Sequence, residues 1–76
     1  MNAEQRKRLS QIIDQLNSTL CEIEEMKDEE EMKYDNLPES LQSSEKGDRF
    51  QEVHSTLDDA YSYLDDAISS LQEVEE

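Results

Sequence analysis

The stretch "LDDAYSYLDDAISS", from Leu57 to Ser70, decides the fold because it contains one seven-residue pattern twice, LDDAYSY and then LDDAISS. The same register extends over four heptads and holds three apolar positions: Phe50, Leu57, Leu64 and Leu71; Val53, Ala60, Ala67 and Val74; and, flanking them, His54, Tyr61 and Ile68. Three apolar positions in seven are typical of a helix that faces a core. We therefore predict a helix over residues 45–74. Leu and Ala would form its seam, because small Ala in alternate layers lets a neighbouring helix approach closely.

The N-terminal segment carries a similar stripe. Its three apolar positions are Leu9, Leu16 and Ile23; Ile12, Thr19 and Met26; and Ile13, Leu20 and Lys27. Such a stripe is wider than the two-in-seven seam of a two-stranded coiled coil. The pattern resumes at Tyr34 and Leu37, and Pro38 then forbids continuation of a helix because it lacks the backbone N–H. The sequence therefore predicts a first helix over residues 3–35.

A connector over residues 36–44 separates the two helices and contains the one Pro of the chain. Pro suits a first helical turn, so we expect a short helical turn near residues 38–42. Ser43 or Ser44 is a good N-cap for the second helix. Gly47 falls on the inward side of that helix, which predicts a site of close helix approach.

This short connector predicts how the helices are arranged. It brings them together antiparallel, so the expected fold is an all-α helical hairpin in a single domain, residues 1–76. The hairpin would place basic residues of one helix start beside acidic residues of the other helix end, and so offset an unfavourable macrodipole interaction. These residues are Arg6, Lys7 and Arg8, and Glu73, Glu75 and Glu76.

The width of the two stripes also bears on the oligomeric state. Two helices alone cannot bury two wide stripes, because each helix covers only part of the other. A second hairpin would complete a four-helix bundle, so we expect a homodimer. The alternative is a monomer in which Leu37 and Leu41 close one end of the hairpin.

Charge and composition narrow the classes of partner. The chain has 21 acidic and 7 basic residues, for a net charge of −14. Such a polyanion repels nucleic acid and anionic lipid, so direct binding of either is not expected, and a basic protein surface is the natural partner. High charge also keeps a small helical protein soluble. Neither a membrane-spanning apolar run nor a signal peptide is evident, so we expect a cytoplasmic protein.

Carboxylates repeat on the predicted outer face of the second helix. Asp58–Asp59 and Asp65–Asp66 lie seven residues apart, about 10.5 Å along a straight helix, and Glu52 and Glu73 extend the row. Two hypotheses compete for this row. It is the solvated face of a protein-interaction module whose helices dock a partner, or it mimics the phosphates of nucleic acid and inhibits a DNA-binding protein.

Few residues suggest catalysis. His54 is the single His, and the position three before it is Gln51, so the Glu-x-x-His motif of a bundle di-iron site fails. Phosphate-cradling glycines are lacking as well. We therefore predict a protein that is not an enzyme and holds no metal or cofactor. Cys21 has acidic neighbours, which disfavour the thiolate, and Tyr63 borders the seam as a dimer contact or a partner anchor.

The stretch "YDNLPESLQSSEKG", from Tyr34 to Gly47, carries a resemblance. It resembles the connector F/Y-D-N-L-P-E-S-L-Q-x-S-x-x-G of a group of small acidic proteins of bacteria and their phages. The likeness covers the connector and the second helix, and no activity comes with it. It implies a phage or mobile-element setting, in which a nucleic-acid mimic would act on a host DNA-binding or defence protein.

Overall fold

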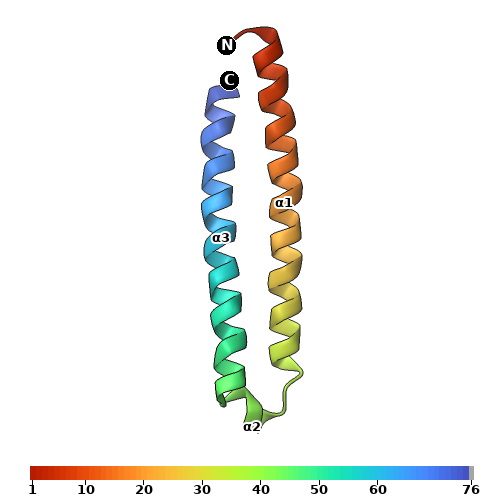
Figure 1. Cartoon of the computed structure of the whole chain (residues 1–76), viewed down its shortest axis with the longest axis vertical. Coiled ribbons are helices and arrows are strands. Elements are labelled where there is room, and N and C mark those ends of the chain that lie inside the picture. Colours follow the sequence, from red (N-terminus) through yellow and green to blue (C-terminus); the bar gives the residue numbers. More distant parts are fainter. Residues whose placement is uncertain (76) are drawn as a thin grey trace.

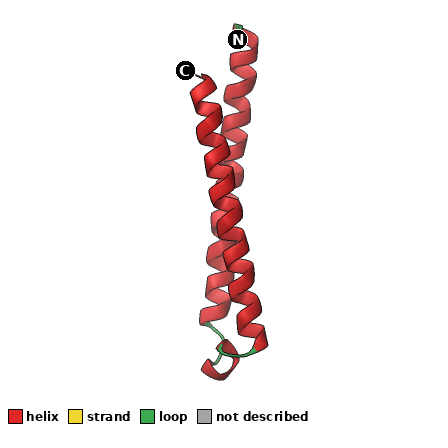
Figure 2. Cartoon of the chain, turned by 90° about the vertical axis from the view of Figure 1, so that its left-hand side faces the viewer, coloured by secondary structure: helices red, strands yellow, loops and turns green. Residues whose placement is uncertain are grey.

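The computed structural model describes residues 1–75, and Glu76 lies outside the described residues. Two long helices, α1 (Ala3–Asp35) and α3 (Glu45–Glu75), run antiparallel and are joined through the short helix α2 (Glu39–Gln42) (Figure 1). The Cα atoms extend over 59 × 15 × 13 Å, so the molecule is a narrow rod. Figure 2 shows the two long helices crossing at a shallow angle, with α2 at the foot. The predicted all-α antiparallel hairpin is confirmed.

A capping box begins α1. The Asn2 side chain accepts a hydrogen bond from the Gln5 backbone N–H at 2.8 Å, and the Gln5 side chain accepts one from the Asn2 N–H at 3.1 Å. These two bonds satisfy donors that the start of a helix leaves free. Both chain ends lie at the same end of the rod (Figure 1), but within residues 1–75 no ion pair joins the basic first turns to the end of α3.

Polar contacts close the other end of the hairpin. The Gln42 amide donates hydrogen bonds to the backbone carbonyls of Tyr34 and Leu37, both at 3.2 Å, and so satisfies carbonyls left free where α1 ends. Leu37 is half-buried, whereas Leu41 is exposed. At this end the hydrogen bonds of Gln42 join α2 to the end of α1, and the monomer alternative, in which Leu37 and Leu41 close the end, stays a prediction.

Gly47 lies where α2 meets α3. It is buried, and a Cβ added there would lie 2.6 Å from the backbone carbonyl carbon of Gln42. Only Gly permits so close an approach of two backbones. The predicted close approach is therefore confirmed, although the neighbour is α2 and not the long helix α1.

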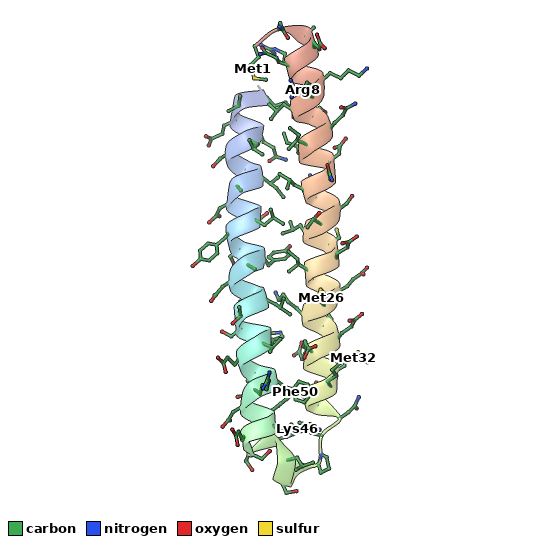
Figure 3. The ribbon with its side chains drawn as sticks, in the orientation of Figure 1. Met1, Arg8, Met26, Met32, Lys46 and Phe50 are labelled. Atoms are coloured by element: carbon green, nitrogen blue, oxygen red, sulfur yellow. The ribbon has the colours of Figure 1, made fainter. Side chains whose placement is uncertain are left out.

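The core is a seam of two positions per heptad. Its centre consists of Leu9, Ile13, Leu20 and Ile68, packed by Leu16, Tyr61, Leu64 and Leu71. Figure 3 shows side chains between the ribbons of the two long helices, with the labelled Phe50 near the α2 end. Spacings alternate between three and four residues, as in coiled-coil packing.

One of the three predicted apolar positions in each helix faces outward, the one with Ile12, Thr19 and Met26 in α1 and with Ala60 and Ala67 in α3, which corrects the interpretation of α3. Tyr61 and Ile68 occupy the seam with the Leu residues, whereas Ala60 and Ala67 are exposed. Two helices can enclose only two positions per heptad, and the larger side chains fill the space between them better. For the same reason, three large apolar residues predicted to lie in the core are exposed: Ile12, Val53 and Val74. Their burial between two copies stays a prediction.

Candidate interaction surfaces

A charged residue, Lys27, occupies a seam position in the second half of α1. Its side chain is 17% exposed, and its Nζ lies 2.6 Å from Asp58 Oδ1 and 4.9 Å from the centre of the Tyr61 ring. The hydrogen bond with Asp58 raises the pKa of Lys27, and the same bond lowers the pKa of Asp58. One carboxylate of the predicted acidic row is therefore engaged within the hairpin.

This ion pair identifies one side of the hairpin, which we name the polar flank. Glu24 directly follows the seam residue Ile23, as Asp58 follows Leu57, so in antiparallel helices both lie on the same side of the seam. The negative charge of Glu24 also raises the pKa of Lys27. Nearer α2, Glu31 and Gln51 line a common groove with Phe50 and His54. Each flank residue directly follows a seam residue, and the set is Ser10, Asn17, Glu24, Glu31, Gln51, Asp58, Asp65 and Gln72.

The opposite side, which we name the apolar flank, carries no carboxylate. Successive helix residues are turned by about 100°, so the residues directly before Ile13, Leu20 and Lys27 on α1, and before Tyr61 and Ile68 on α3, project to the side opposite the polar flank. All are exposed, with Ile12 at 46% and Val74 at 55%. The apolar flank consists of Ile12, Thr19, Met26 and Lys33 on α1, and Val53, Ala60, Ala67 and Val74 on α3.

Two shallow grooves and a border belong to the apolar flank. Near the N-terminus, Met1, Leu9 and Ile12 line one groove together with Gln5 and Arg8. The second groove lies along the first half of α3. It is lined by Arg49, Val53, Thr56 and Leu57 together with three carboxylates, Glu45, Asp48 and Glu52. The border residues are Arg8, Gln15, Glu22 and Glu29 on α1, and Arg49, Thr56, Tyr63 and Ser70 on α3. Among them, Tyr63 is 73% exposed, beside the two small Ala residues.

Acidic residues of α3 are absent from the flank and border positions, although three of them line the second groove. The helix contains nine carboxylates: Glu45, Asp48, Glu52, Asp58, Asp59, Asp65, Asp66, Glu73 and Glu75. None belongs to the apolar flank or its border. From Val53 to Val74, the flank and border positions of α3 are uncharged, so the hairpin is strongly two-sided.

The predicted acidic row divides between two surfaces. Asp58 and Asp65 belong to the polar flank, beside the seam. Glu52, Asp59, Asp66 and Glu73 recur every seven residues on the side of α3 that faces away from α1, and all four are exposed. We name these four residues the outer acidic row. None of them forms an ion pair with another residue of the described chain.

Groups associated with catalysis are dispersed. His54 is half-buried in the seam, and Cys21 is exposed on α1. Residues 1–75 contain no cluster of three His, Cys, Asp or Glu side chains placed to hold a metal ion. No helix in this range combines the length and apolar character needed to cross a membrane.

Comparisons with protein-family models, with curated proteins and with solved structures gave no match. The surfaces that could bind a partner are the apolar flank, the polar flank and the outer acidic row. The apolar flank is the surface that differs most from the rest of this acidic chain.

Proposed function

We propose that the protein is a small, non-enzymatic protein-interaction module that docks another helical surface on its apolar flank. The observation that carries this proposal is the exposure of Ile12, Met26, Val53 and Val74 along one side of the hairpin. Helical partners are recognised through apolar anchors at such spacings along a groove. The likeness of the connector to phage and bacterial proteins supports a phage or mobile-element origin, with action in the cytoplasm.

Only 33% of the residues of this chain are hydrophobic, so the exposure of several of them on one side of the hairpin requires a physical explanation. Contact with a partner removes the flank from water and gains roughly 25 cal/mol for each Å² of apolar surface covered. Tyr63 suits an anchor at the border, because Tyr offers a large contact area and loses little side-chain entropy. The polar flank and outer acidic row would stay in solvent around such a contact.

A pair of charge-introducing variants tests the docking surface. Ala67→Glu places a carboxylate on the apolar flank, and Ser69→Glu places one two residues away, off the flank. Binding of helical partners captured from bacterial lysate should be lost in the first variant and kept in the second. Equal binding by both variants, with unchanged helical circular dichroism, would contradict docking on this flank.

A second candidate function is inhibition of a host DNA-binding or defence protein by mimicry of nucleic acid. The outer acidic row favours it, because its four exposed carboxylates recur about every 10.5 Å along a straight helix. A complex formed through this row should weaken steeply with salt and compete with DNA. Replacing Asp59 and Asp66 with Asn should abolish it, while Ala67→Glu should leave it intact. A complex that survives high salt and ignores DNA would reject mimicry.

A further inference from the structure

We infer that the surface docked on the apolar flank is a second copy of this chain, running antiparallel, with the two-fold axis near Thr19 and Ala67. This inference rests on the proposed function, since it names the partner of the same flank. In the resulting four-helix bundle, α1 packs against α1 of the other copy and α3 packs against α3.

Charge favours a second copy over a basic partner. A basic partner would seek carboxylates, but the apolar flank and its border have three cations, Arg8, Lys33 and Arg49, against two carboxylates, Glu22 and Glu29. Two chains that each carry −14 repel one another through their other faces. The apolar flank, uncharged on α3 from Val53 to Val74, is the face on which they meet with the least repulsion. The polar flank and outer acidic row then face solvent.

The border of α1 favours the antiparallel orientation. Thr19 is the middle residue of α1, which spans Ala3–Asp35, so a two-fold axis there overlaps the whole helix. Ile12 of one copy then faces Met26 of the other. Arg8 faces Glu29, and the two-fold symmetry forms that ion pair twice. A parallel pair would instead place α1 against α3, whose border around Ser70 is uncharged.

The register of the hairpin brings Ala67 to the same axis. Lys27 contacts both Asp58 and Tyr61, so it lies at the level of about residue 59 or 60 of α3. Because the helices are antiparallel, Thr19, eight residues before Lys27, lies at the level of about residue 67. Thr19 and Ala67 therefore lie at one level, and both are small enough for a close approach. The rod extends over 59 × 15 × 13 Å. Along this rod, an axis at Thr19 overlaps the two α1 helices over their whole length. The same axis at Ala67 overlaps the two α3 helices, each Glu45–Glu75, only over residues 59–75.

Thiol crosslinking tests the axis. In Thr19→Cys/Cys21→Ser, the single thiols of the two copies meet at the axis, so a short dithiol crosslinker should give covalent dimers. The natural chain is the matched control, because its Cys21 lies away from the apolar flank and should crosslink little. Efficient crosslinking through Cys21, or crosslinking of Thr19→Cys only to Ala67→Cys, would overturn the antiparallel arrangement.

Sedimentation tests the dimer and the border ion pair. Arg8→Glu should raise the dimer Kd by about fivefold to tenfold, because the pair is lost twice and like charges meet. Adding Glu29→Arg should restore dimerisation, whereas a parallel pair predicts no restoration. If the protein is monomeric at all concentrations but Ala67→Glu still loses a captured helical partner, a second copy is excluded and the docking function stands. If Ala67→Glu changes neither the sedimentation of the protein nor the capture of a helical partner, both the dimer and the docking function are rejected.

Discussion

Two adjacent isoleucines provide a direct test of the seam. Ile13 is 5% exposed in the core, whereas Ile12 is 46% exposed on the apolar flank. Replacing each with Ala makes the same chemical change in the same helix, so differences in helix propensity cancel between the two variants. The free energies of unfolding then report the difference in burial.

The expected magnitudes follow from that burial. Ile→Ala removes three carbons, worth about 0.8 kcal/mol each when buried, and a rigid site adds a cavity cost. Ile13→Ala should therefore lower the free energy of unfolding by about 2.5–3.5 kcal/mol. Ile12→Ala should lower it by only about 1 kcal/mol, because half of its surface is already in water and no closed cavity forms.

Urea unfolding followed by far-ultraviolet circular dichroism measures both values. Low protein concentration keeps self-association from adding to stability, since a dimer would be stabilised by mass action. Equal losses for the two variants at low concentration would refute the two-in-seven seam. At higher concentration, the loss for Ile12→Ala should grow if a second copy covers the apolar flank.

Three further changes probe other parts of the hairpin. Gly47→Ala should cost about 1–3 kcal/mol in urea unfolding, because its Cβ would meet the Gln42 backbone. Asn2→Ala should cost about 1 kcal/mol in the same assay through loss of the capping box. The lowered pKa of Asp58 stabilises the fold above its unfolded value of 3.8, and this contribution is lost as pH falls through the folded pKa. Acid titration of Asp58→Asn should lack that loss, whereas Asp59→Asn should retain it; identical curves would contradict the ion pair.

The helices and their antiparallel order could be predicted from the sequence because their determinants are local. Heptad spacing and Pro38 define the elements, and a short connector leaves few arrangements. The choice between neighbouring stripe positions could not be predicted in this way. Ala60 and Tyr61 differ by one residue, and the register against α1 decides which of them faces the seam.

The ion pair of Lys27 shows a second limit of sequence reasoning. Lys27 and Asp58 are 31 residues apart, so their contact depends on the alignment of two helices and not on any local motif. Sequence spacing alone grouped Asp58 with Asp59 on one outer face. The structure separates these neighbours, because Asp58 turns beside the seam toward Lys27 while Asp59 stays in the outer acidic row.

The placement of carboxylates distinguishes two explanations for the acidity of the chain. If acidity served only to keep the protein in solution, charges would be most useful where apolar side chains are exposed, since they would break up that surface. In the second half of α3 the reverse holds: from Ala60 to Val74 the flank and border positions have no carboxylate, although Val53 shares a groove with Glu45, Asp48 and Glu52. Solubility alone therefore does not account for the pattern. A surface kept free of charge beside strongly charged neighbours is what a contact face requires, because burying an unpaired carboxylate would oppose binding.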